Sequence, residues 1–202
     1  MELGKVDTTK MTGEESFHID GKSLNFDLLS FWQWSSSDLL TNRQRGILAE
    51  YIVASALKLT SKPREDWDAY DLITDTGLKI EVKSSAYVQS WEQDKLSTIS
   101  FGIQPTIKWN EEGIRTTEKV RQAEVYVFCV LTHTDEKTIN PIDLDQWDFY
   151  ILDTDVLNSN VTTQKTITLS SLMNLSPIQS TYQDIHSHIK EIEKRKVLLD
   201  SF

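Results

Sequence analysis

The stretch Leu78-Lys79-Ile80-Glu81-Val82-Lys83-Ser84-Ser85 decides the fold prediction, together with Asp71, which lies ten residues before Glu81. Side chains alternate between the two faces of a strand, so Glu81 and Lys83 project to one side while the apolar residues between them point into a core. A turn at residues 74–77 would let the preceding strand fold back beside this one. We therefore predict a β-hairpin that brings two carboxylates and a lysine together.

The remaining periodicities predict helices and strands around this hairpin, which spans residues 68–85. Apolar residues at helical spacing predict a helix over about 38–59, with Ser37 or Thr41 as the capping candidate. Alternating or continuous apolar runs predict strands at 97–103, 125–131, 147–152 and, as an edge strand, 162–169. We also expect a short helix at 116–122, a C-terminal helix over 176–202 and a loosely ordered segment at 1–20. The expected class is α/β, with a mixed central β-sheet flanked by helices.

Length and composition favour a single domain covering residues 1–202. Hydrophobic residues make up 39% of the chain and charged residues 26%, close to globular averages. The sequence contains neither a long apolar run nor a signal-peptide pattern, so we expect a cytoplasmic protein. The one cysteine, Cys129, lies in an apolar run and is expected to be a core residue rather than a nucleophile.

The net charge of −10 counts against a nucleic-acid partner without excluding one. A local basic cleft and a bound metal ion can overcome the mean charge of the protein. The sequence contains no glycine-rich phosphate loop and no Gly-x-Ser-x-Gly nucleophile elbow, which disfavours an NTPase and an α/β-hydrolase.

Two carboxylates beside a lysine are typical of a site for a hard divalent cation and a charged reactant. Mg²⁺ prefers oxygen ligands and keeps several waters, so Asp71 and Glu81, with the carbonyl of Val82 as a further candidate, suffice as protein ligands. Phosphodiester hydrolysis needs an activated water and neutralisation of charge on the phosphoryl oxygens. Lys83 could steady the attacking hydroxide or a phosphoryl oxygen.

The order of a helical acid, Glu50, then Asp71, then Glu81-Val82-Lys83 resembles the PD-(D/E)xK, or restriction endonuclease-like, nuclease superfamily. The resemblance covers about residues 40–131, and Tyr70 stands where that family's motif has proline. It implies that Asp71 and Glu81 bind Mg²⁺, with Mn²⁺ as a substitute. It also implies that Lys83 orients or activates water, that Glu50 completes the acidic cluster, and that the substrate is DNA rather than RNA.

Three of these assignments have alternatives. Asp68 is the rival of Asp71, although it lies on the opposite face if the strand is regular. Glu50 borders the apolar face of its helix, and a surface glutamate is an equally good interpretation. Glu81 could also simply pair with Lys79 or Lys83.

Candidate nucleic-acid contacts follow the lysine, in the segment where a substrate could run past the metal. They are Ser84, Ser85, Tyr87, Gln89 and Trp91. The two aromatic side chains could stack on bases, although aromatics at four-residue spacing more often pack in a core.

The sequence thus favours a metal-dependent deoxyribonuclease that hydrolyses phosphodiester bonds. The alternative is a noncatalytic module that retains the nuclease fold and binds nucleic acid or protein. A homodimer or a separate recognition subunit remains open.

Overall fold

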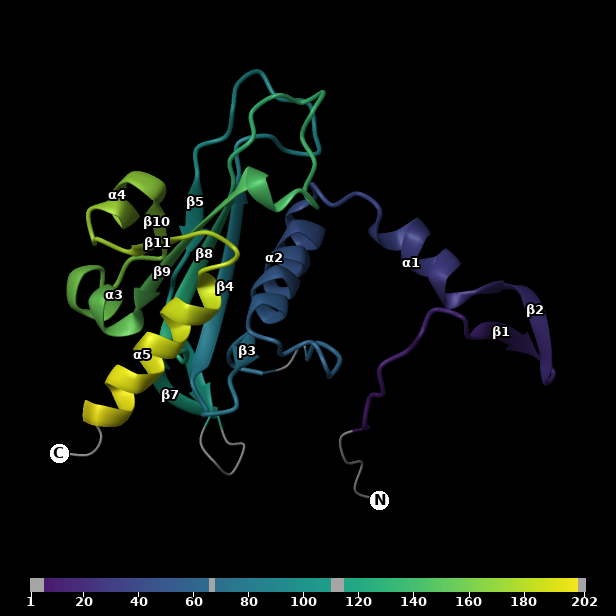
Figure 1. Cartoon of the computed structure of the whole chain (residues 1–202), viewed down its shortest axis with the longest axis horizontal. Helices are drawn as coiled ribbons and strands as arrows, with labels where there is room; N and C mark the ends of the chain where they lie inside the picture. Colours follow the sequence, from purple (N-terminus) through teal and green to yellow (C-terminus); the bar gives the residue numbers. More distant parts are fainter. Residues whose placement is uncertain (1–5, 66–67, 110–114, 200–202) are drawn as a thin grey trace.

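The computed structural model describes residues 6–65, 68–109 and 115–199, which form a sheet-centred body and an N-terminal extension (Figure 1). The central sheet has five strands in the order β11-β9-β8-β4-β3. Strands β4 and β8 pair in parallel, and all other neighbours pair antiparallel. The strands are β3 (Leu72–Ile73), β4 (Lys79–Ala86), β8 (Val125–Leu131), β9 (Trp147–Asp153) and β11 (Ile178–Ser180). The predicted α/β class with a mixed central sheet is confirmed.

Strand β8 forms the centre of the body because all seven of its residues are buried. A continuous apolar run of this kind is typical of a strand covered on both faces. On one face β8 contributes to a core with α2 (Asn42–Ala56) and α5 (Ile185–Leu199). On the other face it packs with four short elements: β5 (Ser100–Gly102), α3 (Thr154–Asn160), β10 (Thr166–Thr168) and α4 (Leu169–Met173). Figure 1 shows α2 on one side of the sheet and α3 and α4 on the other.

Cys129 is fully buried in the first of these two cores, as predicted. Burial raises the pKa of its thiol, because the thiolate would lose its hydration. Cys129 is therefore a packing residue.

The predicted hairpin is confirmed and consists of β3 and β4. Its turn is closed by hydrogen bonds from the Thr74 amide to the Leu78 carbonyl (3.0 Å) and from the Gly77 amide to the Thr74 carbonyl (2.9 Å). Gly77 has φ +90°, a left-handed conformation that glycine adopts without steric cost. The turn therefore fixes the register that brings Asp71 next to β4.

The first predicted helix of the body is confirmed with narrower bounds, because α2 spans Asn42–Ala56 within the predicted 38–59. Thr41 is the N-cap, and its hydroxyl accepts from the Gln44 amide at 3.3 Å. Ser37, the other capping candidate, ends α1 (Leu28–Ser36) instead.

The helix predicted at 116–122 is wrong. Arg115–Val120 form β7, which pairs with β6 (Thr106–Trp109). The β-branched residues Thr116, Thr117 and Val120 favour this extended conformation.

A short 3-10 helix, η1, spans Leu144–Gln146 and directly precedes β9.

The strands predicted at 97–103 and 162–169 exist as the shorter β5 and β10. They pair with each other rather than with the central sheet, so the predicted edge position of 162–169 is wrong. Both strands cover the face of the sheet that lies opposite α2 and α5, and their apolar residues Phe101 and Ile167 belong to the second core.

Both ends of the chain differ from the expected pattern. Residues 178–180 form the edge strand β11, so the C-terminal helix begins only at Ile185, and residues 200–202 lie outside the described part. Three N-terminal elements were not predicted: β1 (Ser16–Ile19), β2 (Lys22–Asp27) and α1. The first of them lies within the segment expected to be loosely ordered, of which residues 1–5 are not described. Among the described helices, none is long and apolar enough to cross a membrane.

Candidate functional site

Strand alternation places Glu81 and Lys83 on one face of β4 and their neighbours Ile80 and Val82 in the α2-facing core. In the parallel register with β8, Glu81 lies opposite Tyr126. Glu81 and Lys83 therefore face the layer that contains β5 and β10. There they line a groove of about 750 Å³, and Asp71 lines it too.

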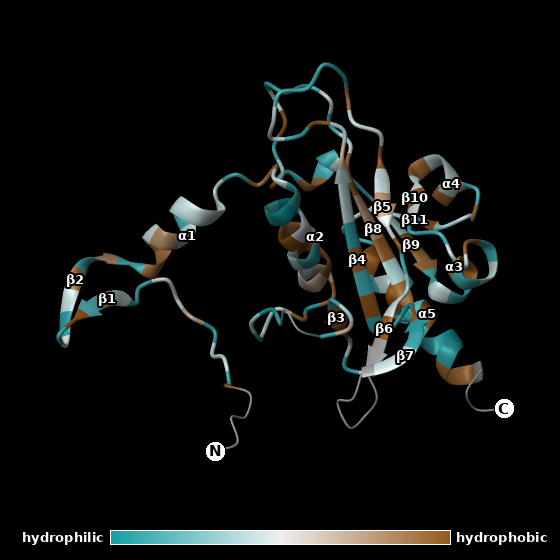
Figure 2. Cartoon of the chain, turned by 180° about the vertical axis from the view of Figure 1, so that it is seen from behind, coloured by the Kyte–Doolittle hydropathy of each residue, from teal (hydrophilic) through white to brown (hydrophobic). Residues whose placement is uncertain are grey.

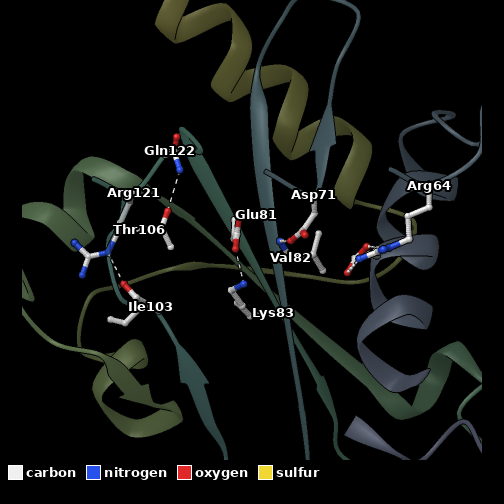
Figure 3. Close-up of polar contacts among 10 residues, drawn as sticks. Arg64, Asp71, Glu81, Val82, Lys83, Ile103, Thr106, Arg121 and Gln122 are labelled. Carbon is white, nitrogen blue, oxygen red and sulfur yellow. Dashed lines mark hydrogen bonds and ion pairs between the residues drawn. The ribbon is translucent and has the colours of Figure 1, made fainter. Parts of the chain in front are cut away.

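Asp71 is fixed beside Glu81 by the backbone of β4. Its amide donates to the Ile80 carbonyl at 3.1 Å, and its Oδ2 accepts from the Val82 amide at 2.7 Å (Figure 3). These two bonds hold the Asp71 carboxylate next to Glu81, the residue between Ile80 and Val82. The prediction that the turn brings Asp71 alongside Glu81 is confirmed.

Burial raises the pKa of Asp71, and the nearby carboxylate of Glu81 raises it further. The hydrogen bond from the Val82 amide and the charges of Lys83 and Arg64 oppose this shift without cancelling it. A carboxylate whose charge is disfavoured by burial and by a second carboxylate is an arrangement that a bound cation relieves.

Lys83 donates to Glu81 Oε1, and both side chains remain partly exposed, at 30% and 20%. Figure 3 shows this ion pair on β4, with Asp71 on the other side of Glu81. The lysine therefore lies at the edge of the acidic pair, where it can reach a ligand in the groove.

Glu50 does not line the groove that contains Asp71, Glu81 and Lys83. Its carboxylate accepts two hydrogen bonds from Arg64, one from Nε and one from Nη2 at 3.0 Å. Helix α2 covers the face of the sheet opposite to the one that carries Glu81 and Lys83, so Glu50 and Arg64 line a separate, smaller groove. Arg64 nevertheless connects the two grooves electrostatically, because its charge lowers the pKa of Asp71.

The predicted nucleic-acid contacts do not line the groove that contains Asp71. The Ser85 hydroxyl is buried and accepts from the Ser100 amide at 3.4 Å, and Tyr87 packs against the second core. Gln89 accepts from the Arg45 guanidinium at 3.1 Å and donates to the Ala86 carbonyl at 2.8 Å, which indicates a structural role. Ser84 is half-buried, and Trp91 is 53% exposed and free to stack on a ligand.

The groove is completed by residues that the sequence patterns did not single out. They come from β6, β8, β10 and the loops between strands, and include Tyr70, Gln104, Thr106, Gln122, Tyr126 and Lys165. Gln122 donates to the Thr106 hydroxyl at 2.9 Å, which ties the start of β6 to the segment before β8. These positions are distant in the chain, and each residue alone carries no recognisable motif.

The residues of the groove fit a hard divalent cation in part. Asp71 and Glu81 offer carboxylate oxygens from neighbouring backbone positions, which suits a Mg²⁺ ion that keeps most of its waters. Within residues 6–65, 68–109 and 115–199, no group of three or more His, Cys, Asp or Glu side chains is placed to hold a metal. The described residues therefore bring two carboxylates, Asp71 and Glu81, to this groove.

The raised pKa of Asp71 predicts a pH-dependent gain in stability for Asp71→Asn. An acid whose folded-state pKa exceeds its unfolded value destabilises the fold progressively as the pH rises through that interval. Without metal, Asp71→Asn should therefore raise the unfolding free energy at pH 7, and the gain should shrink as the pH falls toward 4. Chemical denaturation in the presence of a chelator measures this. Asp68→Asn, at an exposed position, should stay within about 0.5 kcal/mol, and equal gains in both variants would contradict the expectation.

The comparison with family models identifies the family. Residues 22–171 match the model described as bacteriophage T4 endonuclease IV, which is more than half of the 202-residue chain. The chain belongs to the bacteriophage T4 endonuclease IV family. No match was found among curated proteins.

The T4 endonuclease IV match runs from the start of β2 into α4, so it contains the hairpin, the groove and all four predicted catalytic residues. Membership in an endonuclease family agrees with the nuclease chemistry expected from the Asp71, Glu81 and Lys83 pattern. Strand β11 and helix α5 lie outside the matched range.

Proposed function

We propose that this protein is a Mg²⁺-dependent DNA endonuclease whose active site consists of Asp71, Glu81 and Lys83. The observation that carries the proposal is their convergence on one groove, within the part of the chain that matches an endonuclease family. The spacing of the three residues along the hairpin also supports a place in the PD-(D/E)xK superfamily.

Asp71 and Glu81 would hold the metal ion from adjacent positions of the hairpin, with the Val82 carbonyl as a further candidate ligand. A bound Mg²⁺ or Mn²⁺ ion would lower the pKa of a coordinated water and neutralise charge on the phosphoryl oxygens. The Val82 amide keeps the Asp71 carboxylate in place through its 2.7 Å bond. Removal of water from the groove by substrate would strengthen these electrostatic interactions.

Lys83 would hold the attacking water or a nonbridging phosphoryl oxygen. Its ammonium donates to Glu81, so a hydrogen-bonded path connects the lysine to the carboxylate pair. A positioned cation that faces the developing charge stabilises the transition state more than the ground state.

For Glu50 we propose a positioning role instead of direct metal binding. Its carboxylate is occupied by two hydrogen bonds from Arg64, and the Arg64 charge lowers the pKa of Asp71. Glu50 would thus act on the metal site through Arg64, which favours the ionised form of Asp71.

Lys165 is the exposed cation on the β10 side of the groove, across from the hairpin. We expect Lys165→Gln to weaken DNA binding through one lost phosphate contact, and to reduce the dependence of log Kd on log salt by about 1 unit of slope. Fluorescence anisotropy across a salt series, with Ca²⁺ in place of Mg²⁺ to prevent cleavage, measures both quantities. Lys119→Gln, on exposed β7 outside the groove, should leave the slope unchanged. Equal slopes for the Lys165 variant and the parent protein would remove Lys165 from the DNA path.

Cleavage assays on single-stranded and double-stranded DNA and on RNA test the proposed function directly. We expect internal cuts in DNA that require Mg²⁺ or Mn²⁺ and stop with a chelator. DNA binding without cleavage under every metal and substrate tested would instead favour the noncatalytic module. Cleavage that continues with a chelator would overturn the metal dependence.

A further inference from the structure

The N-terminal arm, residues 6–36, consists of the β1–β2 hairpin and helix α1, and it projects away from the body (Figures 1 and 2). Among the residues that the structure describes, it meets the body through a few polar contacts. Lys10 donates to the Thr60 carbonyl at 2.9 Å, and Gln44 donates to Ser35 and Ser36 at 3.3 Å. The arm is therefore positioned by the linker before α2 and a few hydrogen bonds rather than by a shared core.

The backbone of the arm is nevertheless well satisfied by local hydrogen bonds. Glu15 accepts from the amides of Thr12 and Gly13 at 2.9 and 2.8 Å. Asp27 caps α1 by accepting from the Ser30 amide at 2.8 Å. Such contacts specify one conformation for the segment.

What the arm lacks is a hydrophobic core of its own. Gly13 is the only buried residue between positions 6 and 36. Eight large apolar side chains of β1, β2 and α1 are exposed by 36–85%: Phe17, Ile19, Leu24, Phe26, Leu29, Phe31, Trp32 and Trp34. Figure 2 shows hydrophobic residues on all three elements.

The residue pattern of the arm is typical of a segment that is buried against another surface. In the hairpin, apolar residues share one face, where Phe17 and Phe26 stack at 4.7 Å, and His18 and Ser23 meet on the other. In α1, five of the nine residues are large and apolar, and Ser30 and Gln33 are polar residues three positions apart on the helix. Isolated two-stranded hairpins and nine-residue helices are marginal in water, so this structure needs a covering partner.

The exposed area matches what a stable dimer buries. A compact monomer of 23.3 kDa exposes roughly 9,700 Å², whereas this chain exposes 13834 Å². At roughly 200 Å² for each of the eight side chains and about half of that exposed, the apolar face offers roughly 800 Å² per chain. A standard interface takes about 800 Å² from each partner.

Charge argues against nucleic acid as the covering partner. The arm contains five acidic and two basic residues, so its field repels phosphates. An apolar face of this size without a basic rim is suited to packing against another apolar protein surface.

We propose that the N-terminal arm is a dimerisation element, and that its apolar face packs against the arm of a second copy of this chain. An isologous contact uses the same patch on both subunits and closes after two copies, which removes the exposed surface without forming filaments. The inference stands independently of the proposed nuclease function.

Sedimentation velocity of the full chain, with Ile19→Glu/Trp34→Glu as the test variant, decides the proposal. These two positions are 61% and 85% exposed, so the substitutions leave a monomer intact. We expect a dimer of twice 23.3 kDa for the parent protein, and for the variant a dissociation constant raised by roughly 30-fold or more, as for the loss of interface hot spots. Asn25→Glu/Gln33→Glu adds the same charge to the polar faces of the same elements and should dimerise like the parent protein.

Hydrogen exchange of the α1 amides distinguishes this dimer from any other. Protection of α1 should rise with protein concentration in the parent protein and not in the Ile19→Glu/Trp34→Glu variant. A parent protein that stays monomeric, because the arm folds back on its own body or remains free, would overturn the proposal. So would a dimer in which α1 exchanges freely, or equal dissociation of the apolar-face and polar-face variants.

Discussion

Lys83→Ala should reduce the rate of DNA cleavage by about 10²–10⁴-fold, the range for loss of a positioned proton-transfer or charge-stabilising group. The side chain is partly exposed and paired only with Glu81 among the ion pairs of the described residues, so its truncation should leave the fold intact. The loss should appear in kcat with little change in DNA affinity, because Lys83 would act mainly on charge that develops in the transition state.

The control for this variant is Lys79→Ala, which removes the same charge from the same strand. Lys79 lies outside the groove, with its ammonium 5.6 Å from the centre of the Tyr70 ring. Cleavage time courses under single-turnover conditions measure both variants, and circular dichroism verifies that they fold. Comparable losses for Lys79→Ala and Lys83→Ala would mean that the strand's charge, and not the position of Lys83, drives the effect.

The parts of the fold that could be predicted from the sequence are those where local pattern and tertiary environment agree. The apolar run 125–131 predicts a buried strand, and β8 is buried at every position. Glycine at position 77, in a turn between two alternating segments, predicts the hairpin that brings Asp71 beside Glu81. In these cases the chemistry of a few neighbouring residues determines the structure.

The sequence patterns failed where a remote partner determines the structure. Residues 115–120 carry charges at spacings that suit a helix, but pairing with β6 makes them a strand. Strand β5 pairs with β10, and β11 pairs with β9 at the sheet edge. In each pair the two strands are separated by more than twenty residues of sequence, so local patterns do not reveal the pairing. Strand preference reflects such neighbours more than an intrinsic property of the segment.

The same limit applies to the candidate site. Asp71, Glu81 and Lys83 could be predicted to meet because one hairpin contains them all. The separation of Glu50 from this site depends on which face of the sheet α2 covers, which helical spacing does not encode. Gln89 resembled a substrate contact, but the structure uses it to bind the buried Arg45 guanidinium.

The second large effect expected is on metal binding, where Glu81→Gln and Glu50→Gln should behave differently. Glu81→Gln removes one of two carboxylates that line the groove, and we expect a loss of about 100-fold in Mn²⁺ affinity together with a comparable loss of activity. Glu50→Gln releases Arg64 without removing a proposed ligand, so metal affinity should fall by less than about tenfold.

Isothermal titration with Mn²⁺ at two pH values separates a ligand from a positioning residue. If Glu50 acts through Arg64, the Glu50→Gln defect should grow as the pH falls, because Asp71 then protonates more readily and must lose that proton to bind the ion. A ligand would instead lower affinity at both pH values alike. Loss of Mn²⁺ binding in Glu50→Gln as large as that in Glu81→Gln, and independent of pH, would restore Glu50 to the metal site, as the helix-hairpin order of the sequence first suggested.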